Sequence, residues 1–112
     1  MAPALRADEI IGSEVRTSDD KLVGEVRNIV FGTKDRRDYV IVASGGFFVP
    51  GKDSFVIPFR FLQVAPDRII FYLLVTETEL KKVPLMPDPD YAWLSDELWR
   101  AKNDALFEEA VK

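Results

Sequence analysis

The densest apolar stretch of the chain runs from Asp38 to Val64 and reads DYVIVASGGFFVPGKDSFVIPFRFLQV. Within it, Tyr39–Ala43 is a β-branched run that is apolar on both faces, as is typical of a central strand. Phe55–Ile57 is the next apolar run, and Pro58 ends its ladder because proline lacks a backbone donor. This pattern predicts two paired central strands, around which the other segments close.

A long strand is predicted before this pair, over Lys21 to Gly32. Apolar and charged positions alternate through its first half, and the alternation then breaks into three consecutive apolar residues at positions 29–31. Two explanations fit this break. Either a β-bulge near Asn28 re-aims the strand, or both faces of the strand are covered from that point.

Shorter segments complete the predicted sheet. The spacing of apolar residues predicts strands around Val15, from Phe59 to Val64 with Phe59 and Phe61 on one buried face, and over Ile69 to Val75. Before them, a helical turn is expected to stop at Gly12, with Ile10 and Ile11 filling one end of the fold.

Helical signals begin after the last predicted strand. Thr76 and Glu79 have the spacing of a capping box, which predicts a short helix ending before Pro84. Ser95 is the predicted N-cap of a longer helix that continues towards Lys112. Six residues form its predicted apolar stripe: Leu94, Leu98, Trp99, Ala105, Leu106 and Ala110.

The pattern as a whole predicts a mainly β protein. We expect a small antiparallel β-barrel of about six strands, with a short helix and a longer C-terminal helix. Residues 1–84 would form the barrel domain, and residues 85–112 a proline-rich connector and an amphipathic helix within the same structural unit.

Composition narrows the possible chemistry. The chain has 112 residues without histidine or cysteine, which removes the commonest general base, the commonest metal ligand and any thiolate. Asp19-Asp20 does not match an EF-hand spacing and is read as a solvated turn. We therefore expect no enzyme activity, no metal and no cofactor. Without an apolar run of about 20 residues or a signal peptide, we expect no membrane span and a cytoplasmic location.

Charge argues against nucleic acid as a direct partner. The net charge is −4, and residues 85–112 carry all of the excess acid. An acidic chain repels phosphate backbones unless a local basic patch intervenes. Lys34, Arg36 and Arg37 form the one such candidate, and a solvated loop tip is the default interpretation of that segment.

Several segments together resemble a known family. These are RADEIIGSEV, KLVGEVRNIVF, DYVIVASGGF, GKDSFVIPF, LQV and VTETELKKVP, spread from Leu5 to Pro84. They are similar to PRC-barrel domains, such as the cytoplasmic part of the photosynthetic reaction-centre H subunit and the C-terminal domain of a ribosome maturation factor. The resemblance implies the barrel fold and brings no shared catalytic residues.

Six residues are the candidate interaction site: Gly45, Gly46, Phe47, Phe48, Trp93 and Trp99. Adjacent phenylalanines in an extended loop cannot both point inwards, so at least one is a candidate contact for a partner. Around Trp93 and Trp99, the final helix either packs on its own barrel or pairs with a second subunit.

Two functions follow from these observations. The first is a non-enzymatic protein–protein interaction module that binds a protein partner or itself, with a homodimer expected. The alternative is a factor associated with the ribosome or with RNA processing, for which the loop around Lys34 gives the local support.

Overall fold

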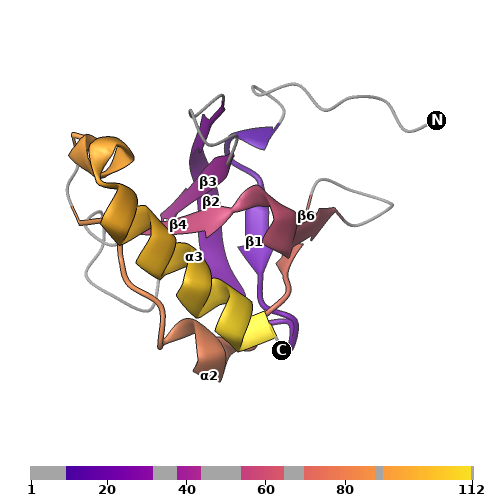
Figure 1. The fold of residues 1–112 in the computed structure, drawn as a ribbon. Coiled ribbons are helices and arrows are strands. Elements are labelled where there is room, and N and C mark those ends of the chain that lie inside the picture. The colour runs from indigo at the N-terminus through magenta and orange to yellow at the C-terminus, as the bar shows by residue number, and fades with distance from the viewer. Residues whose placement is uncertain (1–9, 32–37, 44–53, 65–69, 88–89, 112) are drawn as a thin grey trace.

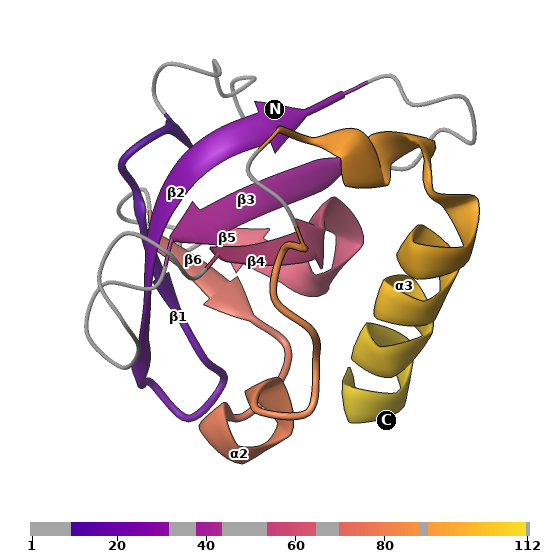
Figure 2. The ribbon, with the colours of Figure 1, turned by 90° about the vertical axis from the view of Figure 1, so that its left-hand side faces the viewer.

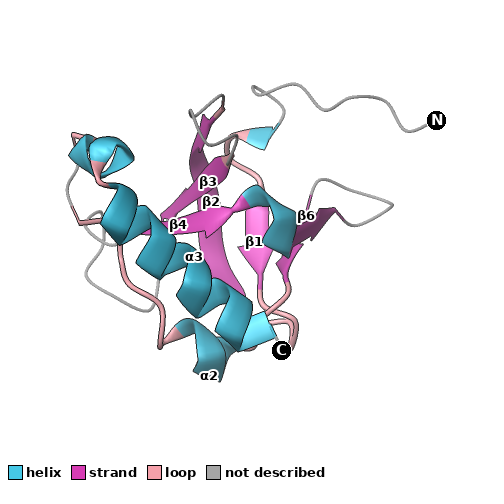
Figure 3. Cartoon of the chain, in the orientation of Figure 1, coloured by secondary structure: helices cyan, strands magenta, loops and turns pink. Residues whose placement is uncertain are grey.

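The computed structural model describes residues 10–31, 38–43, 54–64, 70–87 and 90–111. Six strands form one sheet in the order β4–β3–β2–β1–β6–β5 (Figure 1). The strands are β1 (Glu14–Arg16), β2 (Leu22–Val30), β3 (Tyr39–Ala43), β4 (Ser54–Pro58), β5 (Leu62–Val64) and β6 (Ile70–Leu73). The helices are α2 (Glu77–Leu80) and α3 (Glu97–Val111), with short 3₁₀ helices η1 (Phe59–Phe61) and η2 (Ala92–Ser95). Figure 3 shows α3 in front of the strands and α2 at the foot of the view.

The sheet is mixed and open, which corrects the prediction of an antiparallel barrel. β1 pairs with β6 in parallel, whereas the other neighbouring strands pair antiparallel. β4 and β5 stand at opposite ends of the strand order, so no ladder closes the circle between them. The physical reason lies in η1, which carries the chain directly from β4 into β5 as a helical turn instead of an extended strand.

This same turn corrects the prediction for Phe59 and Phe61. They do not share a strand face: Phe61 is buried and Phe59 is half-buried. The Phe61 ring stacks on Phe107 of α3, with ring centroids 6.1 Å apart and an angle of 17° between the planes. Helix α3 therefore packs against η1, and Figure 2 shows the helix standing beside it.

Strand β3 is buried on both faces, as its sequence predicts. Val40 and Val42 belong to the inner core, the large apolar cluster enclosed by the curled sheet. Tyr39 and Ile41 point the other way and belong to the outer cluster, which also contains Val56, Trp93 and several half-buried residues of the C-terminal segment. The C-terminal quarter of the chain thus packs on both clusters: Trp93 lies in the outer cluster, and Phe107 of α3 lies in the inner core.

Two predicted local features of the sheet are confirmed. The register between β2 and β3 shifts between Val26 and Asn28, which supports the bulge, one of the two explanations left open by the sequence. Gly12 has a φ of +91°, a conformation that suits glycine at the end of the first turn. Ile10 is buried in the inner core, but Ile11 is 48% exposed, so only one of the two isoleucines fills the end of the fold.

Thr76 is the N-cap of α2, as predicted. The Thr76 hydroxyl oxygen accepts a hydrogen bond from the Glu79 amide at 3.2 Å. A second cap comes from the turn between β1 and β2, where an Asp19 carboxylate oxygen accepts from the Glu77 amide at 3.1 Å. The bond from Glu77 to Asp19 joins the start of α2 to the turn between β1 and β2.

The chain between α2 and α3 covers the outer edge of β4. Leu85 forms an isolated antiparallel bridge with Phe55, and the Met86 amide donates to the Ser54 carbonyl at 2.7 Å. Covering an edge strand in this way removes unpaired backbone groups that would invite another strand.

Helix α3 begins one residue later than predicted. Ser95 closes η2, and the N-cap of α3 is Asp96, whose carboxylate accepts from the Trp99 amide at 3.0 Å. None of the described helices has the length and apolar character needed to cross a bilayer.

Candidate functional site

The six candidate interaction residues fall in two groups. Gly45, Gly46, Phe47 and Phe48 lie outside the described residues. Trp93 and Trp99 are described, and both pack within the chain itself. Trp93 is 1% exposed and Trp99 is half-buried, so the Trp93 ring is covered by this chain's own atoms.

The tryptophans form one aromatic group with β3. The Trp93 ring meets Tyr39 edge to face at 5.6 Å and lies 5.6 Å from Trp99 and 5.9 Å from Tyr91, measured between ring centroids. Such edge and tilted contacts are favourable geometries for aromatic rings. At the far side, the Asn28 side-chain amide donates to the Tyr91 hydroxyl at 3.0 Å. Of the two arrangements left open by the sequence, the structure has the final helix packed on its own sheet.

A group of polar side chains is buried under α3, next to this aromatic group. The Tyr39 hydroxyl donates to an Asp104 carboxylate oxygen at 3.2 Å, and the Asn103 amide donates to the Val56 carbonyl at 2.9 Å. Arg100 is buried beside them, at 5% exposure. Burial raises the pKa of the Tyr39 hydroxyl to about 12, and the nearby Asp104 carboxylate adds to this effect. At neutral pH the hydroxyl therefore stays protonated and acts as a donor.

The predicted apolar stripe of α3 is confirmed in part. Leu94, Trp99, Leu106 and Ala110 are half-buried against the two clusters, but Leu98 is 85% exposed and Ala105 is also exposed. The fully buried residues of the helix are Arg100, Asn103, Asp104 and Phe107. Polar residues can occupy the inner face because the tyrosine hydroxyl of β3 and the carbonyl of β4 supply partners there. No pattern of hydrophobic residues could reveal this face.

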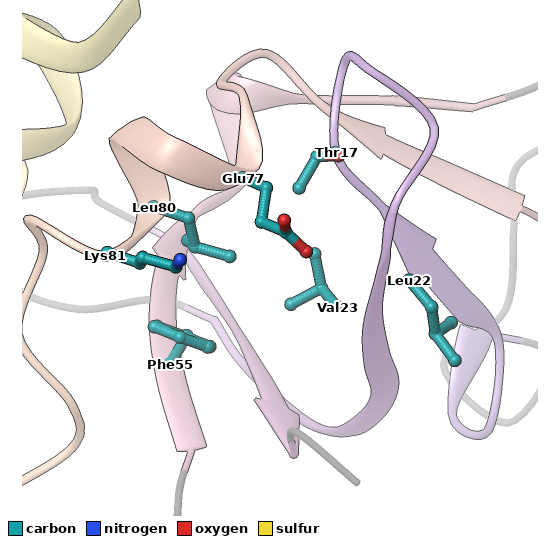
Figure 4. Close-up of a pocket in the computed structure, with 7 residues that line it drawn as sticks. All are labelled: Thr17, Leu22, Val23, Phe55, Glu77, Leu80 and Lys81. Atoms are coloured by element: carbon teal, nitrogen blue, oxygen red, sulfur yellow. The ribbon is translucent and has the colours of Figure 1, made fainter. Parts of the chain in front are cut away.

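An apolar pocket opens at the end of the sheet next to α2. It has a volume of about 220 Å³, and its lining residues are Thr17, Leu22, Val23, Phe55, Glu77, Leu80 and Lys81 (Figure 4). Strands β2 and β4 supply Val23 and Phe55, and α2 supplies Leu80. These three residues are at most 7% exposed and form the inner wall, whereas Leu22, also in the lining, is 44% exposed and its side chain lies on the other side of β2 from Val23 (Figure 4).

Two opposite charges stand at the rim of this pocket. Glu77 and Lys81 are four residues apart on the α2 segment, and Figure 4 shows both side chains reaching over the same space. Among the described residues, neither forms an ion pair; the neighbouring pair is Lys82 with Glu79, at 3.4 Å between nitrogen and oxygen. The rim therefore presents one acidic and one basic side chain to a bound ligand or protein partner.

The wall of the pocket is held in place by the turn between β1 and β2. Thr17 donates a hydrogen bond to Asp19, and the same hydroxyl accepts from the Lys21 amide at 2.9 Å. The bond from Thr17 lowers the pKa of the Asp19 carboxyl, which favours the charged form that caps α2. Asp19 thus serves as a structural cap, in agreement with the reading of this segment as a turn.

The described part of the chain offers a pocket and a buried tyrosine hydroxyl. Within the described ranges, no three acidic, histidine or cysteine residues are grouped so that they could hold a metal ion. The buried hydroxyl of Tyr39 lies beneath α3, away from solvent, where no substrate reaches it. The pocket has apolar inner walls and two charged residues in its lining, which suits an apolar side chain.

Comparison with known proteins supports the resemblance seen in the sequence. The family model described as PRC-barrel domain matches residues 3–80. A search of curated proteins found no match. The family match ends at the last residue of α2, so the outer layer built from η2 and α3 lies beyond it.

Proposed function

Because this chain belongs to the PRC-barrel domain family, we propose that it is a non-enzymatic protein–protein interaction module that associates with further copies of itself. The family match alone carries no function, since one fold supports many roles. The support for an interaction role comes from the surface of the molecule. A cytoplasmic location is part of the same proposal.

The end pocket is the observation that carries the proposal. Of its apolar lining residues, Leu22 is 44% exposed, whereas Val23, Phe55 and Leu80 are at most 7% exposed and form the inner wall. Its volume of about 220 Å³ lies below the roughly 300–1,000 Å³ of typical small-molecule sites. An engineered apolar cavity of roughly 150 Å³ can hold a benzene-sized group. The pocket thus suits a single apolar side chain better than a whole substrate.

The absence of suitable reactive groups supports a non-enzymatic role. The chain has no histidine or cysteine, and general acid–base catalysis needs a positioned proton donor or acceptor within reach of a substrate. Glu77 and Lys81 are the charged groups at the pocket. We assign them to recognition of a partner's charges, because both stand at the rim beside an apolar lining.

Sedimentation equilibrium of the purified protein over a wide concentration range tests self-association. We expect the mean mass to rise above that of the 12.7 kDa chain as concentration increases. A mass that stays at one chain throughout would contradict self-association.

A pull-down of the tagged protein from native lysate, with and without ribonuclease, separates this proposal from the alternative. Recovery of untagged copies of the chain supports self-association. Recovery of ribosomal proteins would favour a ribosome-associated factor, and loss of that recovery after ribonuclease would mean that RNA bridges them. The basic residues behind this alternative, including Lys34, lie outside the described residues.

A further inference from the structure

The most exposed large apolar residue among those described is Leu98, at 85%. It is the second residue of α3, directly after the Asp96 cap, so its backbone is fixed by the first turn of the helix. The neighbouring Trp99 is half-buried against the outer cluster, which leaves Leu98 projecting from a well-anchored helix. A rigidly held apolar side chain of this kind is suited to inserting into a pocket.

Charged residues flank Leu98 in a defined order. Glu97 precedes it and Lys102 follows one helical turn later, and both side chains are exposed. The end pocket has the matching pair at its rim, with Glu77 and Lys81 also one turn apart. Each surface therefore presents one acid and one base around an apolar centre, so the two surfaces can be oriented with Glu97 near Lys81 and Lys102 near Glu77.

The two surfaces cannot meet within one chain. In both views of the ribbon, the start of α3 and helix α2 lie at opposite ends of the molecule (Figures 1 and 2). The residue that projects and the pocket that could receive it must therefore come from different copies.

We infer that Leu98 of one copy inserts into the end pocket of the next copy, in a head-to-tail contact between α3 and the α2 end of the sheet. Here the end pocket means the lining formed by Leu22, Val23, Phe55 and Leu80. This inference rests on the proposed self-association and names the two surfaces that make it. A contact between two different surfaces is heterologous, so it continues as an open chain unless the rotation between copies closes a ring.

Two variants test the two sides of the contact separately. Leu98→Asp removes the projecting residue, and the pocket variant combines Leu22→Asp with Lys81→Glu at the rim. Each should weaken association at least about tenfold, the effect typical of a central apolar contact. Both sets of positions are exposed, so circular dichroism and the thermal midpoint should match the parent protein. Val64→Asp is the matched control, because Val64 has the same 44% exposure as Leu22 and lies on β5.

Mixing the two variants gives the decisive result. In the mixture, Leu98 of the pocket variant can enter the intact pocket of Leu98→Asp, so one contact forms and assembly stops at a dimer. Sedimentation should therefore detect dimers in the mixture and monomers in each variant alone. A charge exchange gives a finer test: Glu97→Lys alone and Lys81→Glu alone should each weaken association on the order of twofold to fivefold, and mixing them should recover it.

Three results would overturn the inference, and they are distinguishable. If the parent protein stays monomeric, the proposed self-association fails together with this contact. If the parent protein associates and both variants associate equally well, this contact is wrong while self-association stands. If only Leu98→Asp weakens association and mixing gives no rescue, the contact is a symmetric one through α3, which also contradicts the head-to-tail arrangement.

Discussion

Strand β3 has apolar partners on one face and a mixture of aromatic and polar partners on the other. Val40 and Val42 are enclosed by valine, leucine and phenylalanine side chains of the inner core. Tyr39 on the opposite face meets the Trp93 ring and the Asp104 carboxylate. Both faces are fully buried, so the difference between them lies in the kind of contact and not in its extent.

The two faces differ in how strictly they select their partners. An apolar core accepts many arrangements of similar volume, whereas a buried polar group requires a partner at a defined place. The outer layer also retains buried polar atoms without a hydrogen-bond partner among the described residues, namely Trp93 Nε1 and Asn103 Oδ1. We therefore expect the inner core to supply most of the stability and the outer contacts to fix where the start of α3, with Leu98, is placed.

The largest expected effect is a truncation in the inner core. Phe71→Ala removes a fully buried ring and should lower the free energy of unfolding by about 3–5 kcal/mol, measured by urea denaturation. Its cross-strand neighbour provides the control: Val64→Ala should change stability by no more than about 0.5 kcal/mol, since Val64 is half-exposed. Similar losses at both positions would mean that the inner core is not the main source of stability.

A smaller loss is expected when the hydrogen bond between α3 and β4 is removed. Asn103→Leu keeps a side chain of similar size but leaves the Val56 carbonyl without that donor, which should cost about 1–3 kcal/mol in the same denaturation experiment. Lys102→Leu is the matched control on the exposed face, with little expected change. An unchanged stability for Asn103→Leu would contradict the role of this bond in seating α3.

The Tyr39 hydroxyl should contribute less, and in a pH-dependent way. Tyr39→Phe removes its bond to Asp104 and should cost about 0.5–1.5 kcal/mol near neutral pH. Because folding raises the pKa of this hydroxyl to about 12, the folded state favours the neutral form. The stability due to this shift is present below the unfolded pKa of about 10 and is lost as pH rises from there towards 12.

An ultraviolet titration of tyrosinate in the parent protein and in Tyr39→Phe measures this directly. The difference between the two curves should have a midpoint near 12. A midpoint near 10 would mean that Tyr39 is open to solvent and that α3 does not seal the outer face.

The smallest effect is expected for the exposed ion pair between η1 and α3. An Arg60 guanidinium nitrogen lies 3.0 Å from a Glu108 carboxylate oxygen, with both side chains largely in solvent. Glu108→Gln should change the free energy of unfolding by about 0–1 kcal/mol, and less in high salt. A larger loss, insensitive to salt, would place this pair among the contacts that determine the position of α3.

The sequence predicted the inner sheet well because its signals are local. The apolar run of β3, the bulge near Asn28 and the N-cap at Thr76 all follow from residues that are close together in the chain. Each of these features is fixed by periodicity or by a hydrogen bond across three residues.

The outer layer could not be predicted in the same way. Arg100, Asn103 and Asp104 carry no apolar signal, and their burial depends on partners in β3 and β4 that are distant in the chain. The end pocket likewise joins segments from three parts of the chain, so no motif marks it. Leu98 looked like a core residue, because an apolar pattern does not distinguish a buried side chain from one that projects into solvent.

The parallel pairing of β1 with β6 has a consequence for how the protein is made. Glu14 lies opposite Ile70, so the first strand finds one of its two neighbours only after most of the sheet has been synthesised. Contacts between residues so far apart in the chain slow folding, because a long loop must close before they form. While the chain emerges from the ribosome, β2, β3 and β4 can pair with one another. One edge of β1, at Val15, has no strand partner until Phe71 of β6 has been synthesised.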